Sequence, residues 1–294
     1  MALRKSSFRQ SLVALSLVAP FTLTFLLVFA WPTWEMIRLS FTDAPLIGPG
    51  EWIGLGNYRE LFEDRLFWIA LKNNAYFIAL TIVPTTAIAL LIALAVNRLK
   101  GWMQALILAA FFLPFILPVS VVTIIWSWML DFQFGILQPA IAFFFGERVA
   151  VFRDPYWVMP TIAVVTIWWT NGFNVLLFLA GLRNIPAELH EAASLDGATP
   201  RQRFLKVTWP LLWPVTALVL TLQLILQLKL FDQVYLLSQG GPFNQSQVLL
   251  LLVYREAFQQ NEGGYSSAIA LVLFVIILVV SVLQFQLLRI RRPR

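Results

Sequence analysis

The sequence predicts an all-α integral membrane protein with six transmembrane helices. Of its 294 residues, 60% are hydrophobic and only 12% are charged, whereas an average soluble domain carries about 25% charged residues. Uncharged windows of the length that a membrane helix needs, roughly 20 residues, recur along the chain. The basic residues are concentrated in a few segments between these windows, a pattern typical of loops on the cytoplasmic side.

Six uncharged windows are long enough to cross a bilayer. We predict membrane helices at residues 12–34, 73–96, 101–130, 155–182, 207–228 and 265–288. The first window exceeds the apolar core of a signal peptide and lacks a small-residue cleavage site after it, so we expect it to be retained. Prolines inside the windows predict kinks, with a hinge role as the alternative. They are Pro20, Pro84, Pro114, Pro118 and Pro160.

Two further uncharged windows are not predicted to span. Residues 132–146 are too few, so we expect them to lie along the membrane surface. Residues 233–254 are interrupted by the polar sequence SQGGPFNQSQ at 238–247. Because lipid does not tolerate backbone without internal hydrogen bonds, we predict a loop here, at the surface or in a cavity.

The charge distribution predicts the orientation of the chain. An even number of spans places both termini on one side, and both ends are basic. Basic residues also dominate residues 97–100 and 183–206, which predicts that these segments and both termini are cytoplasmic. The basic residues concerned are Arg4, Lys5, Arg9, Arg98, Lys100, Arg183, Arg201, Arg203, Lys206, Arg289, Arg291, Arg292 and Arg294. Membrane topology thus explains the net charge of +6, and we predict no nucleic-acid partner.

The residue types exclude several kinds of chemistry. The chain has no cysteine and a single histidine, His190. Disulfides, a cysteine nucleophile and metal sites built from cysteine or several histidines are therefore excluded. The phosphate-binding pattern G-x-x-x-x-G-K-[ST] is also missing, so any ATP hydrolysis belongs to another polypeptide. We predict no catalytic residue, no metal ligand and no cofactor bound by this chain.

The charged loop, residues 183–210, is predicted to form two short helices joined by a corner. Pro186 suits a first helical turn, where its missing N–H is not needed. Asp196 and Gly197 form a turn dipeptide, and glycine readily adopts the left-handed conformation that ends a helix. Thr199 and Gln202 match a capping box at the start of the second helix.

The first of these short helices has the features of a docking element. Ala192 and Ala193 are small enough to permit close approach of a partner, and Glu191 and Arg201 supply charged groups. The alternative is an ordinary solvated loop with two helical turns.

The same residues resemble a known motif. Glu191-Ala192-Ala193, Gly197 after three residues, and Val207-x-Trp209-Pro210 after nine more resemble the EAA loop of the membrane subunits of binding-protein-dependent ABC importers. The family usually has Ile and Leu where this chain has Val207 and Trp209. The resemblance extends along nearly the whole chain to the carbohydrate branch, the relatives of the maltose and glycerol-phosphate importer permeases. It includes LAGLRNIPAELHEAASLDGA (179–198), SFTD (40–43), GLGNY (54–58), GGP (240–242) and YREAF (254–258).

The resemblance implies the architecture of an ABC type I importer permease. Residues 1–67 would form a cytoplasmic tail, the first membrane helix and a periplasmic segment, and residues 68–294 a core permease domain of five membrane helices. The first short helix of the charged loop would be a coupling helix in a groove of a cytoplasmic ATPase subunit. The coupling residues would be Glu188, Glu191, Ala192, Ala193, Asp196, Gly197 and Arg201.

The resemblance also implies partners and a location. Partners would be a second, related permease forming a heterodimer, two ATPase subunits that bind ATP and Mg²⁺, and a periplasmic or lipid-anchored sugar-binding protein. The loop at Gly240, Gly241 and Pro242 would face the binding protein. The chain would lie in the cytoplasmic membrane of a bacterium or archaeon.

Polar and aromatic residues in and after two predicted spans are candidates for a substrate path. Amides donate and accept hydrogen bonds with sugar hydroxyls, and polar residues in spans usually face a bundle interior or a cavity. The candidates are Trp168, Trp169, Asn171, Asn174, Gln223, Gln227, Lys229, Asp232, Gln233 and Tyr235. As an alternative, the amides hold helices together, the aromatic rings anchor at the interface, and Lys229 and Asp232 form a local ion pair.

The function predicted is that of a permease subunit of an ABC importer. It would move a carbohydrate, or a related polyol or glycoside, by alternating access driven by a separate ATPase. The alternatives are an ion-coupled secondary transporter, a membrane-embedded enzyme and a permease of the same family for a non-sugar solute. An ion-coupled transporter would need buried carboxylates, and the predicted spans hold no acid away from their ends.

Overall fold

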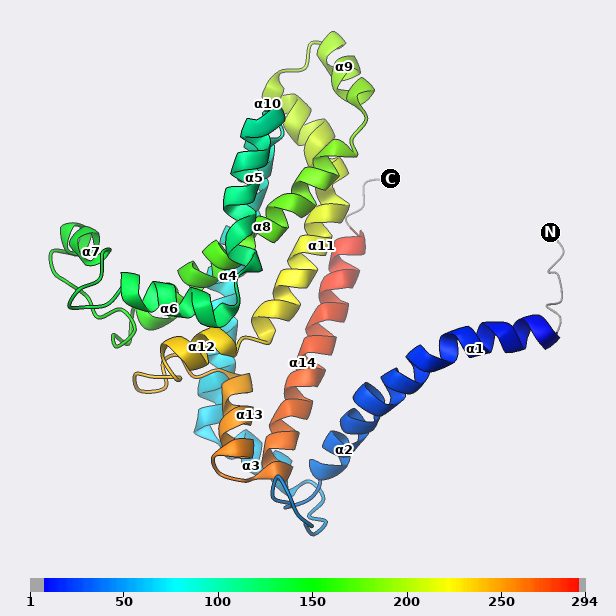
Figure 1. The fold of residues 1–294 in the computed structure, drawn as a ribbon, viewed down its shortest axis with the longest axis vertical. Helices are drawn as coiled ribbons and strands as arrows, with labels where there is room; N and C mark the ends of the chain where they lie inside the picture. The colour runs from blue at the N-terminus through cyan, green and yellow to red at the C-terminus, as the bar shows by residue number, and fades with distance from the viewer. Residues whose placement is uncertain (1–7, 291–294) are drawn as a thin grey trace. The chain divides into compact units, whose positions relative to one another are not determined.

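The computed structural model describes residues 8–290, in which the regular secondary structure is helical (Figure 1). Among these residues, the only β-pairing is an isolated bridge between Thr42 and Trp52. The chain divides into two compact units. Unit 1 comprises residues 1–63 and 253–272, and unit 2 comprises residues 64–252 and 273–294. The predicted all-α class is confirmed.

Five helices in the described range are long and apolar enough to cross a membrane. They are Leu15–Leu39, Arg65–Val96, Val158–Arg183, Pro200–Leu228 and Gly263–Gln286. A sixth candidate is the pair α5 (Gly101–Ile116) and α6 (Val119–Met129), if the two are counted as one span. The six predicted windows each correspond to one of these candidates, although the helix ends lie up to several residues beyond the windows.

The third predicted span is not one continuous helix. Helices α5 and α6 meet at 101°, because Leu117 is extended with ψ 138° and Pro118 follows it. A residue before proline is driven out of the helical conformation, and proline has no N–H to donate. Of the predicted kink positions, only Pro118 separates two helices. Pro20, Pro84 and Pro114 lie inside helices, and Pro160 lies in the first turn of α8 (Val158–Arg183).

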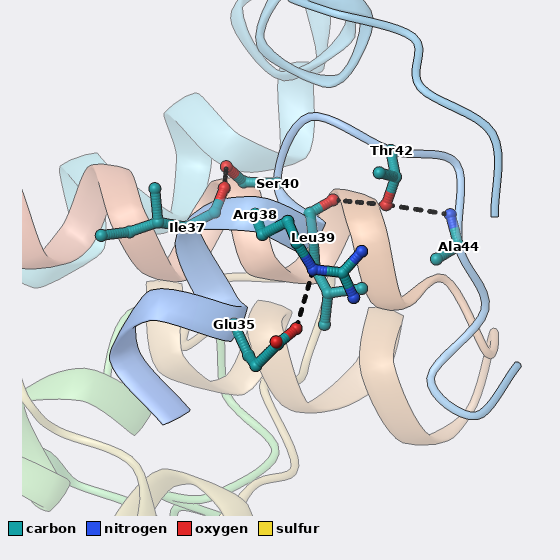
Figure 2. A network of polar contacts seen from close by, with 7 residues as sticks. All are labelled: Glu35, Ile37, Arg38, Leu39, Ser40, Thr42 and Ala44. Atoms are coloured by element: carbon teal, nitrogen blue, oxygen red, sulfur yellow. Dashed lines mark hydrogen bonds and ion pairs between the residues drawn. The ribbon is translucent and has the colours of Figure 1, made fainter. Parts of the chain in front are cut away.

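Unit 1 begins with α1 (Phe8–Phe25), a π-helical turn (Leu26–Ala30) and α2 (Trp31–Leu39). Figure 2 shows how hydroxyl groups end α2: Ser40 Oγ donates to the carbonyl of Ile37 at 2.7 Å, and Thr42 Oγ1 donates to that of Leu39 at 2.8 Å. Arg38 Nε pairs with Glu35 Oε2 at 2.9 Å in the same view.

The SFTD and GLGNY sequences contact each other in unit 1. Asn57, in α3 (Gly56–Glu63), donates from Nδ2 to the carbonyls of Ser40 at 3.0 Å and Thr42 at 2.8 Å. The hydroxyls of Tyr58 and Ser40 lie 2.7 Å apart. A Cβ at Gly264 would overlap the carbonyl oxygen of Thr42, so only glycine fits there. These sequences therefore hold unit 1 together.

Unit 2 is built on α4 (Arg65–Val96), α5, α8 (Val158–Arg183) and α11 (Trp209–Leu228), which pack against one another. The buried apolar core comprises Ala89, Leu90, Ala93, Val96, Val175, Phe178, Leu179, Leu182, Leu212 and Val219. Two glycines of α8 allow close approach of helices: a Cβ at Gly172 would overlap the backbone of Phe111, and one at Gly181 would lie 2.8 Å from Val215.

The two windows predicted not to span contain short helices. Residues 132–146 include α7 (Gln138–Phe145). Residues 233–254 include most of α12 (Asp232–Leu237) and the start of α13 (Leu249–Phe258), and the predicted loop at 238–247 is non-helical. The last helix is α14 (Gly263–Ile290). Arg4, Lys5, Arg291, Arg292 and Arg294 lie outside the described residues, so the side on which the termini lie stays a prediction.

Candidate functional site

The charged loop forms the two predicted short helices, although Pro186 precedes the first turn of the first helix as its N-cap. Helix α9 (Ala187–Leu195) ends at Asp196, and Gly197 adopts φ +78°. The N–H of Gly197 donates to Ser194 O and that of Ala198 to Ala193 O, both at 3.0 Å, which satisfies carbonyls at the helix end. This confirms the predicted corner after the first short helix.

The second short helix starts with the predicted capping box. Thr199 Oγ1 accepts from the N–H of Gln202 at 3.3 Å, and Gln202 Oε1 accepts from the N–H of Thr199 at 2.8 Å. Helix α10 (Pro200–Arg203) continues through a π-helical turn (Phe204–Thr208) into α11. The N–H of Trp209 donates to the carbonyl of Phe204, so the wider turn carries the helix past Pro210. The charged loop is therefore mechanically continuous with a membrane helix, Pro200–Leu228.

Helix α9 buries no residue, and all of its residues except His190 and Ala193 are exposed. Six of the seven candidate coupling residues are exposed, and Ala193 is half-buried. A hollow of about 480 Å³ lies beside α9 and is lined by His190, Glu191, Ser194, Leu195 and Arg203.

Two residues of this hollow bring α9 and α10 together. Arg203 Nη1 donates to Ser194 Oγ at 2.7 Å. Leu195 is 90% exposed at the rim of the hollow. Sequence reasoning missed Ser194, Leu195 and Arg203 as site residues. An apolar side chain among charged neighbours was the only available signal for Leu195, and nothing local marked the other two.

The α8 candidates for the substrate path divide by exposure. Trp168 is 41% exposed and packs edge-on against Trp126, with ring centroids 5.5 Å apart. Trp169 is half-buried, and its indole Nε1 donates to the carbonyl of Leu117 at 3.1 Å. That carbonyl belongs to the break between α5 and α6. Asn171 and Asn174 are buried, so these four residues do not share one exposed face.

The substrate-path candidates in and after α11 also differ in exposure. Gln223 and Gln227 are buried, and Gln227 Nε2 donates to Gln223 Oε1 at 3.0 Å. Lys229 and Asp232 are both exposed. In the described part of the chain they form no ion pair with each other, so that prediction is wrong. Helix α11 ends at Leu228 and α12 starts only at Asp232, so helical spacing does not bring the two side chains together.

The remaining two candidates belong to α12. Gln233 is buried. The ring of Tyr235 is half-buried and stacks on Phe231 at 5.4 Å with an interplanar angle of 13°.

Buried polar side chains form a layer next to the apolar core of unit 2. Thr85, Asn171 and Gln223 each lie four residues from a core residue of the same helix, namely Ala89, Val175 and Val219. Positions four apart share a helix face, so the three polar groups follow the core on three neighbouring helices. Asn174 belongs to the same layer, because it is buried and lies four residues before the core residue Phe178. Thr85 Oγ1, Asn171 Oδ1 and both amide atoms of Asn174 have no hydrogen-bond partner.

The loop at Gly240, Gly241 and Pro242 is compact. Ser246 Oγ donates to the carbonyl of Gly241 at 2.6 Å, and the hydroxyls of Ser246 and Ser238 lie 2.8 Å apart. Phe243 is 87% exposed at this loop.

A further hollow of about 420 Å³ lies between the end of α6, residues 150–153 and α12, and Asp131, Gln133 and Arg153 are among its lining residues. Across the described residues, no three histidine or acidic side chains gather in a way that could hold a metal ion.

These features define a polytopic membrane subunit whose charged loop, residues 183–210, continues directly into a membrane helix. The chain belongs to the family of binding-protein-dependent transport system inner membrane components, whose model matches residues 85–292. It is therefore the membrane-spanning permease subunit of an ABC importer, and ATP hydrolysis belongs to a separate subunit. Family membership supports this reading over an ion-coupled transporter or a membrane-embedded enzyme.

Curated relatives match nearly the whole chain. The sulfoquinovosyl glycerol transport system permease protein SmoG of Agrobacterium fabrum is 30% identical over 95% of this chain and 91% of its own length. The arabinooligosaccharides transport system permease protein AraP of Bacillus subtilis is 34% identical over 92% and 86%. The multiple sugar-binding transport system permease protein MsmF of Streptococcus mutans is 34% identical over 88% and 89%.

Two crystal structures share the fold. One is a bacterial ABC transporter involved in the import of the acidic polysaccharide alginate, with a TM-score of 0.87 over 97% of this chain and 98% of that chain. The other is a bacterial alginate ABC transporter in complex with its alginate pentasaccharide-bound periplasmic protein, with the same TM-score over 97% and 96%. Both are 22% identical in sequence. They confirm the importer-permease fold.

Proposed function

We propose that this chain translocates a carbohydrate, or a related polyol or glycoside, across the cytoplasmic membrane of a bacterium or archaeon. It would do so beside a second permease, with two ATPase subunits and a sugar-binding protein. The solutes named for the relatives support the substrate class, since they include sulfoquinovosyl glycerol and arabino-oligosaccharides. Both termini and the charged loop would face the cytoplasm, as the basic residues predict.

The observation that carries the proposal is the continuity between the charged loop and helix Pro200–Leu228. Helix α9 would dock in a groove of an ATPase subunit, with Leu195 as an apolar anchor and with Glu191 and Arg201 at the polar rim. Closure of two ATP-loaded ATPases would displace α9. Because Arg203 bonds to Ser194, α10 would move with α9, and α11 would follow as the same helix. This chain itself would bind neither ATP nor Mg²⁺.

The packing of α11 against α4 and α8 supports alternating access. These helices share the apolar core of unit 2, so a tilt of α11 would be passed to both. The unpartnered Oδ1 of Asn171 and the unpartnered amide of Asn174 lie next to that core. A polar layer with free hydrogen-bonding capacity suits a region where helices change partners, because unsatisfied buried groups are otherwise costly.

The solute-facing residues would be the exposed candidates. Trp168 offers a flat ring to the apolar C–H face of a sugar, and Lys229 and Asp232 have free charged groups for hydroxyl or acidic substituents. Trp169 would instead hold α8 against the break between α5 and α6 through its bond to Leu117, and Gln223 and Gln227 would bond to each other within α11. The loop at Gly240, Gly241 and Pro242 would face the binding protein.

Reconstitution in proteoliposomes tests the proposal. The complete importer, isolated through a tag on this chain, should accumulate radiolabelled oligosaccharides or glycosides only with ATP inside and binding protein outside. Uptake by this chain alone, driven by a proton or sodium gradient, would contradict the proposal. ATP-dependent uptake of amino acids or peptides, with none of any sugar in the panel, would retain the importer but reject the substrate class.

A further inference from the structure

Two adjacent asparagines of α4 hold the loop between α12 and α13. Asn73 Nδ2 donates to the carbonyls of Asn244 at 2.9 Å and Gln247 at 2.8 Å. Asn73 is buried. It is separated from both residues by more than 170 positions in the sequence. Both bonds use the amide as a donor to backbone carbonyls.

Asn74 connects the same helix to two helix ends. Its Oδ1 accepts from the N–H of Leu249, the first residue of α13, at 2.9 Å. Its Nδ2 donates to the carbonyl of Leu228, the last residue of α11, at 3.4 Å. The first N–H groups and last carbonyls of a helix lack partners within the helix. One buried side chain of α4 thus satisfies a group at the end of α11 and another at the start of α13.

The loop that these asparagines hold has an unusual backbone. Gln239, Phe243 and Asn244 all have positive φ, between 51° and 61°, a region that residues other than glycine rarely adopt. Such conformations persist only when surrounding contacts impose them, and they cluster at functional sites. The bonds from Asn73 reach the loop at Asn244 itself, next to the exposed Phe243.

We propose that Asn73 and Asn74 are positioning residues that tie this loop, residues 238–248, to the end of helix Pro200–Leu228. That helix begins in the charged loop, and α9 and α12 lie at its opposite ends (Figure 1). A displacement at one end of the helix therefore reaches the loop at the other through α4. The inference rests on the proposed function, and it identifies how engagement of the binding-protein side is relayed to the ATPase side.

The chain itself permits a direct test of the tether. It contains no cysteine, so Phe243→Cys supplies a single site for a nitroxide spin label. Asn73→Leu and Asn74→Leu keep the number and branching of the side-chain heavy atoms but remove the hydrogen bonds. Each should increase label mobility in the electron paramagnetic resonance spectrum. Thr85→Val is the matched control: it lies in the same helix, is buried, and loses no hydrogen bond, so mobility should not change.

A second readout separates positioning from a merely structural role. In nanodiscs, the complete importer carrying either leucine variant without the label should keep its basal ATPase rate within about twofold. Stimulation by its binding protein should fall by roughly fivefold or more, the factor expected for losing about one net buried hydrogen bond. Increased mobility of the 238–248 loop without a fall in ATPase stimulation would overturn the proposal. Unchanged label mobility in the leucine variants would also overturn it.

Two aspartate variants test the same proposal if the leucine variants do not fold. Both bury a carboxylate, so their difference reports the direction of the hydrogen bonds. Asn73→Asp removes both donations, whereas Asn74→Asp keeps the acceptor for Leu249. Asn74→Asp also loses the donation to Leu228 that ties the loop to the helix end, so stimulation should fall in both variants. Label mobility should rise more in Asn73→Asp, which loses both bonds to the loop, and equal mobility in the two variants would contradict the assignment. A wild-type complex without binding-protein stimulation would instead refute the proposed function, whatever the label mobility shows.

Discussion

The charged loop and the 238–248 loop flank the same helix, yet different contacts hold them. The charged loop is shaped by residues a few positions apart: Gly197 closes α9, and Thr199 and Gln202 cap α10. The 238–248 loop takes part of its shape from Asn73, on a helix far away in the sequence. Local contacts leave a loop free to move as a unit with its helix. Distant contacts bind a loop to the rest of the fold, so the two ends should respond differently to substitution.

The largest effect is expected for Gly197→Pro. Proline locks φ near −65°, and Gly197 needs φ +78°, so the corner between α9 and α10 would be lost. ATP-driven uptake should fall more than roughly tenfold while the membrane helices remain inserted, because no span is altered. Uptake and ATPase activity are measured together in proteoliposomes. Gly197→Asn, which tolerates the left-handed conformation, should retain most uptake, and normal transport by the proline variant would show that the corner does not couple.

A smaller effect is expected for Leu195→Asp. Loss of an exposed apolar anchor should weaken ATPase binding by about tenfold, in the range of interface hot spots, without changing the thermal stability of the chain. The affinity of the nanodisc-embedded permease for the isolated ATPase subunit gives the measurement. Ile47→Asp is the matched control, since Ile47 is 89% exposed and lies outside unit 2. Equal weakening by both variants would remove Leu195 from the proposed interface.

Two neighbouring tryptophans differ in the same way: Trp168 is exposed, whereas Trp169 is held by a hydrogen bond to a distant backbone carbonyl. Trp168→Ala should raise the KM for solute uptake severalfold with little change in complex assembly, because the ring is exposed and would face the solute. Trp169→Phe should leave KM unchanged and lower the melting temperature by a few degrees, because the carbonyl of Leu117 loses its donor. The reverse pattern would exchange the roles assigned to the two residues.

The smallest effect is expected for Thr199→Ala. Removing one N-cap costs about 1 kcal/mol, and the cost should be confined to the charged loop because the capping box is local. Hydrogen exchange should accelerate at residues 199–203 and stay unchanged at 238–248. Acceleration at both loops would mean that the two ends are more tightly linked than their contacts indicate.

The sequence by itself determined the all-α class, the approximate positions of the six spans, and the corner and capping box of the charged loop. These features depend on hydrophobicity, charge and capping within a few residues of each other, which any sequence displays. The resemblance at the EAA residues extended this to the family. The break at Pro118 was visible only as a possible kink, because one proline does not specify a 101° bend.

Only the tertiary structure decided which polar residues are exposed and which are tethered. Trp168 and Trp169 are adjacent, yet one is exposed and the other caps a broken helix. Lys229 and Asp232 have helical spacing without a helix between them. Asn73 and Asn74 read as ordinary residues near the start of a span until Leu228, Asn244, Gln247 and Leu249 lie beside them. The physical reason is that a buried hydrogen bond depends on which backbone groups packing leaves without partners, and folding brings those groups from distant parts of the chain.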